Sequence, residues 1–154
     1  MEGYIYKNRV TLLKKWDNVT NESRLENTGI YKKHGISVSI SVAPFNHKKH
    51  KFYNSTQPEL QKIDCAVFWG TDGEIPKQVL AKVVLTINGK TVAIPNSAFS
   101  DLYEPQLNEI HICRGPDNVI YLSMNNSDGA GGYTIIWIIK DGKYYARYID
   151  DSMV

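Results

Sequence analysis

The fold of this chain is decided by residues 119–150, which read VIYLSMNNSDGAGGYTIIWIIKDGKYYARYID. Asp141-Gly142 separates two runs of β-branched and aromatic residues, and this dipeptide favours the positive φ values of a tight hairpin turn. With these two residues as the loop, the register places Trp137 opposite Ala146 and puts Arg147 on the other face. Both faces of the predicted pair are largely apolar, so we expect a central pair of strands covered on two sides.

More strands are indicated on the N-terminal side of this hairpin. Asn88-Gly89 is a second strong turn signal and predicts a hairpin over residues 83–94, with Thr86 opposite Thr91. Residues 36–42, ISVSISV, alternate between apolar and serine side chains and predict a half-buried strand. We also expect strands at residues 4–16, 63–69, 109–113 and 119–124, helical turns at 58–62 and 96–103, and loops at 17–29, 44–57 and 125–132.

These segments together predict an all-β fold class. About 8–10 short strands joined by short turns, with one or two short helical turns, are typical of an antiparallel β-sandwich or a barrel-like sheet. No internal repeat or linker divides the chain, and its 154 residues are enough to bury one core. We therefore expect a single β domain spanning residues 1–154.

The composition argues against several classes of protein. No apolar run approaches the ~20 residues of a membrane helix, and we expect no signal peptide because the N-terminus lacks an apolar region. The two cysteines, Cys65 and Cys113, both fall in predicted strands and have no zinc-ligand spacing. We therefore expect buried free thiols and a cytoplasmic location, with no membrane, metal or cofactor.

The glycine-rich loop NNSDGAGG at residues 125–132 could be mistaken for a phosphate site. A phosphate cradle needs a helix directly after the glycines, and here a strand is predicted instead. A single acid, Asp128, is too few for a calcium loop. No Gly-x-Ser-x-Gly motif is present, and neither cysteine has the setting of a nucleophile. These patterns indicate a protein that is not an enzyme.

The basic run from His47 to Lys51 permits two alternatives. Its histidines and lysines are the residue types of a small ribonuclease, in which proton transfer and charge stabilisation act on one phosphate. The run could also contact nucleic acid, with Phe45, Phe52 and Tyr53 stacking on bases. A net charge of only +2 argues against a nucleic-acid partner, and a solvated basic loop is the simpler interpretation.

Charge is distributed unevenly along the chain. Residues 1–58 contain ten Lys or Arg against four Asp or Glu, whereas residues 59–154 contain eight against twelve. The acids of the second half lie near predicted turns, and turns at one end of a sandwich come together in space. An acidic rim could dock a basic protein and speed its encounter. The candidate partner-binding residues are Asp72, Glu74, Asp101, Glu104, Glu109 and Asp128.

Three segments carry a resemblance to known proteins: FWGTDGEIP at residues 68–76, LTINGKTVAIPNSAFSDL at 85–102 and DGAGGYTIIWIIKDGKYYARYI at 128–149. In these segments the chain resembles small bacterial β-sheet proteins, some of which are immunity partners of toxins in contact-dependent growth inhibition. The resemblance implies a cytoplasmic, non-enzymatic inhibitor that covers the active site of a cognate toxin. The alternative is a carbohydrate-binding β-sandwich, or an inhibitor of a cell-wall enzyme, which exposed Tyr or Trp on a flat sheet face would favour.

Overall fold

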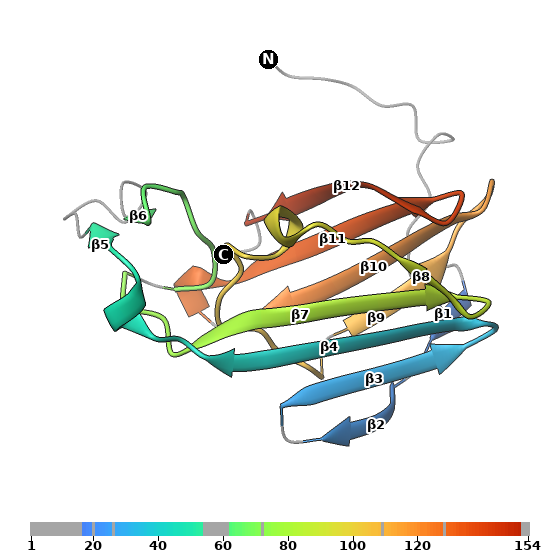
Figure 1. Ribbon diagram of the computed structural model, residues 1–154, viewed down its shortest axis with the longest axis horizontal. Helices are drawn as coiled ribbons and strands as arrows, with labels where there is room; N and C mark the ends of the chain where they lie inside the picture. The colour runs from blue at the N-terminus through green and yellow to red at the C-terminus, as the bar shows by residue number, and fades with distance from the viewer. Residues whose placement is uncertain are drawn as a thin grey trace, which may run out of the picture.

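The computed structural model describes residues 17–19, 21–25, 27–53, 62–71, 73–108, 110–127 and 129–151. Within these residues the chain forms twelve strands, three 3₁₀ turns and no α-helix. Ten of the strands make two five-stranded antiparallel sheets that pack on one hydrophobic core (Figure 1). The predicted all-β fold class is confirmed, with more strands than expected, and the architecture is a sandwich.

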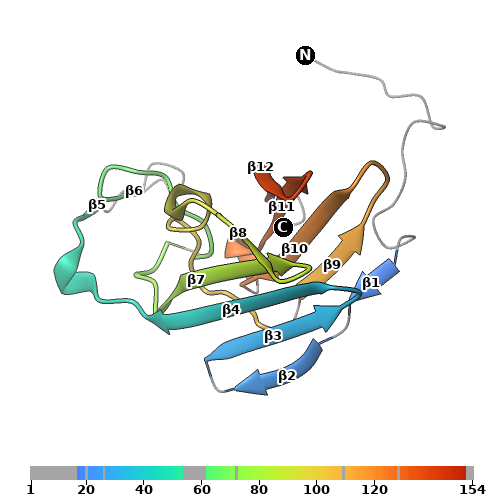
Figure 2. The ribbon, with the colours of Figure 1, turned by 45° about the vertical axis from the view of Figure 1, so that its right-hand side comes forward.

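Each sheet combines strands that are distant in the sequence. The C-terminal sheet has the order β1 (Asp17–Val19), β9 (Ile110–Arg114), β10 (Val119–Asn126), β11 (Tyr133–Lys140) and β12 (Lys143–Asp150). The N-terminal sheet has the order β2 (Asn21–Leu25), β3 (Thr28–Lys33), β4 (Ile36–Pro44), β7 (Gln78–Ile87) and β8 (Lys90–Val92). Figure 2 shows the strands of the two sheets running in different directions.

The two ends of the sandwich differ. At one end, the hairpin end, the turns Asn88-Gly89 and Asp141-Gly142 lie close enough to line a common hollow. At the other, the loop end, β4 ends and β7 begins, and a two-stranded sheet of β5 (Phe52–Tyr53) and β6 (Lys62–Ile63) projects beyond it (Figure 1). The 3₁₀ turns are His47–Lys49, Asn96–Ala98 and Gly129–Gly131.

Alternation along the strands builds the core. In β10 and β11 every second side chain is buried, so Leu122 and Trp137 point inward while their chain neighbours are half-buried. The facing sheet contributes Val38, Ile40 and Leu85, all fully buried. Burying an aliphatic side chain of this size stabilises the fold by about 1.5–3 kcal/mol. The core therefore depends on period-two patterning in both sheets.

The segment between β8 and β9 is bonded to both sheets. Its residues Ala98 and Leu102 are buried in the core. The indole nitrogen Nε1 of Trp137 in the C-terminal sheet donates to the carbonyl of Ala98 at 2.8 Å. The hydroxyl of Tyr31 in the N-terminal sheet donates to the carbonyl of Leu107. The segment thus joins the two layers, and its middle part leads to the loop end.

The hairpin at Asn88-Gly89 forms as predicted, because Thr86 pairs with Thr91 across it. At Asp141-Gly142 the turn is confirmed but the register beyond it is wrong. A β-bulge after the turn shifts the pairing, so that Trp137 lies opposite Arg147 and not opposite Ala146. One extra residue reverses the alternation of the strand that follows it. The bulge therefore places Arg147 on the core-facing side of β12.

The expectation that this pair of strands is central and covered on both sides is also wrong. β12 is an edge strand of the C-terminal sheet, and the outward side chains of β11 are only half-buried. Tyr145 and Tyr148 of β12 are 70% and 59% exposed. An antiparallel edge needs burial on one face only, and aromatic residues in it do not require a second covering layer.

Two further sequence predictions are wrong. The polar residues 17–29, expected to be a loop, contain β1, β2 and the start of β3. β1 and β2 are edge strands, which are held by backbone pairing to one neighbour and do not need an apolar pattern. Only residue 63 of the predicted strand 63–69 lies in a strand. Asp64 and Cys65 have positive φ and turn the chain, so Cys65 is exposed rather than buried.

Some of the remaining predictions are confirmed, and others fall outside the described residues. The strands predicted at 109–113 and 119–124 are confirmed in their described residues as β9 and β10, and so is the short turn within residues 96–103. β10 continues through residues 125 and 126, which the sequence predicts to belong to the following loop. The predicted loop at 44–57 includes a 3₁₀ turn and β5 in its described part. Cys113 is buried, as expected, and forms no disulfide within the described residues. The strands predicted at 4–16 and most of the helical turn predicted at 58–62 lie outside the described residues.

The inward placement of Arg147 leads to the first prediction. Its guanidinium donates to both carboxylate oxygens of Asp101 at 2.5 and 2.6 Å, and both side chains are at most a quarter exposed. Asp101→Asn should lower the free energy of unfolding by about 1–3 kcal/mol, because it leaves a half-buried guanidinium without its counter-charge. Urea unfolding followed by circular dichroism measures this loss.

The matched control for this prediction is Asp141→Asn at the exposed hairpin turn. It removes the same charge where no internal partner is lost, so stability should change by less than about 0.5 kcal/mol. Equal effects of the two substitutions would show that the Asp101 to Arg147 pair does not connect β12 to the β8–β9 segment.

Candidate functional site

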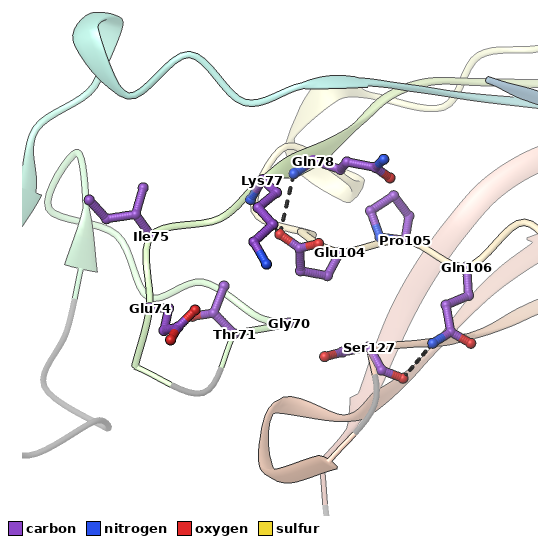
Figure 3. Close-up of a pocket in the computed structure, with 10 residues that line it drawn as sticks. All are labelled: Gly70, Thr71, Glu74, Ile75, Lys77, Gln78, Glu104, Pro105, Gln106 and Ser127. Atoms are coloured by element: carbon purple, nitrogen blue, oxygen red, sulfur yellow. Dashed lines mark hydrogen bonds between the residues drawn. The ribbon is translucent and has the colours of Figure 1, made fainter. Parts of the chain in front are cut away.

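The loop end contains a hollow of about 380 Å³ that is open to solvent (Figure 3). Three loops that are far apart in the sequence form its walls. They contribute Gly70, Thr71, Glu74, Ile75, Lys77 and Gln78 from the first loop, Glu104, Pro105 and Gln106 from the second, and Ser127 from the third. The lining is mixed, with two carboxylates, one lysine and several neutral polar groups, so it suits a polar side chain of a partner better than an apolar ligand.

Close backbone approaches hold the first loop against the second. Trp69 and Leu102 form a β-bridge, and the Tyr103 amide donates to the Trp69 carbonyl at 2.9 Å. Gly70 has a φ of +111°, and a Cβ there would lie 2.1 Å from the carbonyl oxygen of Tyr103. Only glycine fits this position, because it tolerates the dihedral angle and has no side chain to clash.

The third loop is joined to the other two in the same way. A Cβ on Gly131 would lie 2.6 Å from the backbone carbon of Thr71, so these two loops are also in backbone contact. The Gln106 amide nitrogen Nε2 donates to the Ser127 carbonyl at 2.8 Å (Figure 3). The Gln106 backbone N–H donates to the buried side chain of Asn126 at 3.0 Å. The walls of the hollow are therefore fixed by hydrogen bonds and close packing.

Glu104 is used within the fold. Its carboxylate oxygen Oε1 accepts hydrogen bonds from the backbone N–H groups of Lys77 and Gln78, and Figure 3 shows the side chain pointing toward them. Its own amide donates to the Gln78 carbonyl at 3.1 Å, and its carbonyl accepts from Ser127 at 3.0 Å. A carboxylate that accepts two backbone N–H bonds anchors the start of β7.

The six acids predicted to bind a partner lie in different environments or outside the described residues. Asp72, Glu109 and Asp128 lie outside the described residues. Asp101 is paired with Arg147, and Glu104 accepts from backbone amides. Glu74 is exposed and lines the hollow. The hollow brings together the loops that carry Glu74 and Glu104, along with Thr71 next to Asp72 and Ser127 next to Asp128.

A basic loop lies beside the hollow at the same end. The carbonyl of Lys77 accepts a hydrogen bond from the amide of Phe45, where this loop begins. The Asn46 side chain accepts from the amide of Lys48 and caps the 3₁₀ turn. His50 Nδ1 lies 2.7 Å from the carboxylate of Asp64. The backbone of the basic run singled out in the sequence is therefore hydrogen-bonded at the Asn46 cap and at Asp64.

Asp64 connects this loop to β6. Its second carboxylate oxygen accepts from the Lys51 amide at 2.8 Å, and its own amide donates to the Lys51 carbonyl at 2.8 Å. The Lys51 N–H, followed by the hydrogen bond to His50, lowers the pKa of Asp64 below its usual 3.8. The Asp64 contacts are therefore fully present above about pH 4 and weaken as the pH falls through the lowered pKa.

Aromatic rings connect the same loop to the sandwich. Phe45 stacks on His50 with ring centroids 4.8 Å apart and meets Tyr103 edge-to-face at 5.3 Å. Phe68 contacts Tyr103 at 5.6 Å and Phe52 at 6.0 Å. Burial raises the pKa of Tyr103 to about 12, so its hydroxyl is neutral at physiological pH. Edge-to-face pairs of this kind each contribute about 0.5–1.5 kcal/mol.

Sequence reasoning missed most of this arrangement. It singled out the acids, but not Gly70, whose close approach to Tyr103 positions the hollow. The two glycines of GTDG read as an ordinary turn, and no local pattern distinguishes a glycine that is needed for space. The aromatic contacts join residues from positions 45 to 103, and no spacing rule could have paired them.

The prediction about the glycine-rich loop at 125–132 is confirmed in its described part, where a 3₁₀ turn at Gly129–Gly131 leads into β11 and not into a helix. In the part of the chain that the structure covers, no three His, Cys, Asp or Glu side chains gather as metal ligands would. The helices found there are single 3₁₀ turns, and none has the length and hydropathy to cross a bilayer. No family model, curated protein or solved structure matches this chain.

The second prediction compares two glycines that both have positive φ. Gly70→Ala should destabilise the protein by about 1–3 kcal/mol more than Gly89→Ala, because the added methyl group meets the Tyr103 carbonyl. Gly89 has φ +78° and nothing lies within 4 Å of a Cβ added there, so its substitution adds only the cost of the dihedral angle, about 1–2 kcal/mol. Thermal and urea unfolding measure both values. Equal losses would contradict the close approach at Gly70.

Proposed function

We propose that this protein is a non-enzymatic, protein-binding inhibitor, and specifically an immunity protein that covers the active site of a cognate bacterial toxin. The observation that carries the proposal is the convergence of four separate segments, near residues 45–53, 62–77, 101–107 and 127–131, into one fixed surface at the loop end. A surface that is already ordered loses little conformational entropy on binding, so more of its contact energy appears as affinity.

The exposed apolar residues at the loop end support a protein partner. Val67 and Ile75 are about half exposed, at 51% and 49%, and lie on the loops that lead into and around the hollow. Exposed aliphatic residues surrounded by polar groups are typical of protein contact sites. The resemblance of residues 68–149 to small immunity proteins agrees with this assignment. Cys65 and Cys113 form no disulfide within the described residues, which agrees with the reducing cytoplasm, where we place the protein.

The test of this function is complex formation with the product of the neighbouring gene, which the proposal expects to be the toxin. We expect a stable one-to-one complex by size-exclusion chromatography with light scattering, and loss of toxin activity when the two are mixed. Val67→Ala with Ile75→Ala should weaken the complex at least about tenfold, because exposed aliphatic anchors at an interface lose their contact.

The matched control removes two exposed apolar side chains elsewhere. Tyr145→Ala with Tyr148→Ala changes β12, away from the hollow, and should leave toxin binding within about twofold. No complex at micromolar concentration would refute the immunity function. An equal loss in the two double variants would refute the loop end as its contact surface.

A carbohydrate-binding sandwich is the second candidate, and one feature favours it. Tyr148 lies opposite Ile136 on the outer face of the C-terminal sheet and is 59% exposed. Tyr121 pairs with Ile138 in the same face. Aromatic rings on an open sheet face offer flat apolar surface next to a hydroxyl group, which suits the face of a sugar ring.

The carbohydrate alternative has its own test. If it holds, soluble peptidoglycan fragments or oligosaccharides should shift the amide signals of Tyr148 and Tyr121 in NMR titrations, and Tyr148→Ala should weaken binding at least about tenfold. Shifts at Val67 and Ile75, with none on β12, would reject this face as a sugar site. Tyr145→Ala is the matched control, because Tyr145 is the bulge residue beside this face.

A further inference from the structure

The projecting β5–β6 lobe has a basic and partly apolar surface. We define the lobe patch as Lys48, Lys49, Lys51, Tyr53, Lys62 and Val67, all of which are exposed. Tyr53 and Lys62 lie opposite each other on β5 and β6, and the Cys65 thiol contacts the Tyr53 hydroxyl at 3.5 Å. The patch therefore combines lysines from two segments with an aromatic ring between them.

Within the described residues, the lobe patch carries four lysines and the lobe contains one carboxylate. Asp64 is the only carboxylate among residues 45–53 and 62–67, and its two oxygens accept from His50 and the Lys51 amide. None of the four lysines forms an ion pair within the described residues. Glu59 belongs to residues 54–61, outside the described part. Within the described residues, the lobe patch therefore carries an excess of positive charge.

The backbone under the lobe patch is held in place. The Asn46 cap, the Asp64 hydrogen bonds and the ring contacts of Phe45 with His50 and Tyr103 all act on this short stretch of chain. A flexible basic loop does not need these contacts, because a solvated lysine has little energetic cost at any position on the surface. The backbone positions that carry these lysines and the exposed ring of Tyr53 are therefore defined by contacts within the fold.

The aromatic residues indicate which kind of acidic partner fits. Base stacking by nucleic-acid binders uses several open rings along the strand path. Phe45 and Phe52, which the sequence suggested for stacking, are turned to His50, Tyr103 and Phe68. Tyr53 at 45% exposure is the one large ring left open in the described lobe. The aliphatic Val67, at 51%, follows two residues after Cys65, whose thiol contacts the Tyr53 hydroxyl. An apolar centre with a charged rim fits a protein surface.

We propose that the lobe patch docks an acidic, partly apolar segment of a partner protein, with partner carboxylates on the lysines and apolar side chains on Tyr53 and Val67. The proposal rests on the proposed protein-binding function and sets the sign of the partner's charge. It differs from the sequence expectation of a basic partner, because two of the predicted acids, Asp101 and Glu104, have partners inside the fold.

The test measures direct binding with defined probes. Fluorescein-labelled peptides of twelve residues, one alternating Asp or Glu with Leu and Phe and one with Lys in place of each acid, are titrated in about 20 mM salt to limit screening. A twelve-nucleotide single-stranded RNA is the third probe. We expect the acidic peptide to bind at least about tenfold more tightly than the basic peptide and more tightly than the RNA.

Charge-reversal variants locate the binding. The triple variant Lys48→Glu, Lys49→Glu and Lys62→Glu should bind the acidic peptide at least about tenfold more weakly. The matched control reverses the charge of three lysines that are also exposed but lie at the hairpin end, Lys90, Lys140 and Lys143. Its affinity for the acidic peptide should stay within about twofold of the unchanged protein. Circular dichroism confirms that both triple variants are folded. Equal losses in the two variants, tighter RNA binding, or no preference for the acidic peptide would each overturn the proposal.

Cys65 provides a second readout that needs no substitution in the lobe patch. Its thiol is exposed beside Tyr53, whereas Cys113 is buried, so a maleimide reagent should label Cys65 alone. Bound acidic peptide should slow this labelling, and unchanged labelling at saturating peptide would overturn the proposed location. If the toxin binds but the lysine variants bind it equally well, the lobe patch is wrong and the inhibitor function stands. If the acidic peptide binds there but no toxin does, the function is wrong and the patch stands.

Discussion

The hydrogen bond from Trp137 Nε1 to the carbonyl of Ala98 is the contact on which the rest of the structure depends. It forms in the dry centre of the sandwich, where an unpaired indole N–H would cost about 1–3 kcal/mol. It fixes the long β8–β9 segment to one sheet, while Tyr31 fixes the same segment to the other sheet through Leu107. Because the segment is held at both of its ends, its middle part has a defined position.

Tyr103 connects the β8–β9 segment to the loop end. Its carbonyl accepts from the Tyr133 hydroxyl at 3.0 Å and lies against Gly70, and its amide donates to Trp69. Its ring meets Phe45 and Phe68, which support the basic lobe. The same network of contacts therefore positions both the hollow and the lobe patch.

The charged groups that are available for recognition differ from those that the sequence suggested. The sequence suggested a rim of acids, but an acid near a turn can serve the turn itself. Glu104 bonds to the first amides of β7, and Asp101 neutralises an arginine that a bulge turned inward. The lysines of the basic run form no ion pair within the described fold, and Glu74 is the predicted acid that stays exposed at the hollow.

The sequence alone determined the all-β class, the two Gly turns and the inward side chains of residues 36–40, because turn chemistry and period-two patterning are local. It did not determine the polar edge strands, the bulge before Arg147 or the turn at Asp64, because each depends on a neighbouring strand or on a distant acceptor. Only the tertiary structure decided which residues line the hollow and which charges stay open. Those properties arise from contacts between loops tens of residues apart, and no local pattern carries that information.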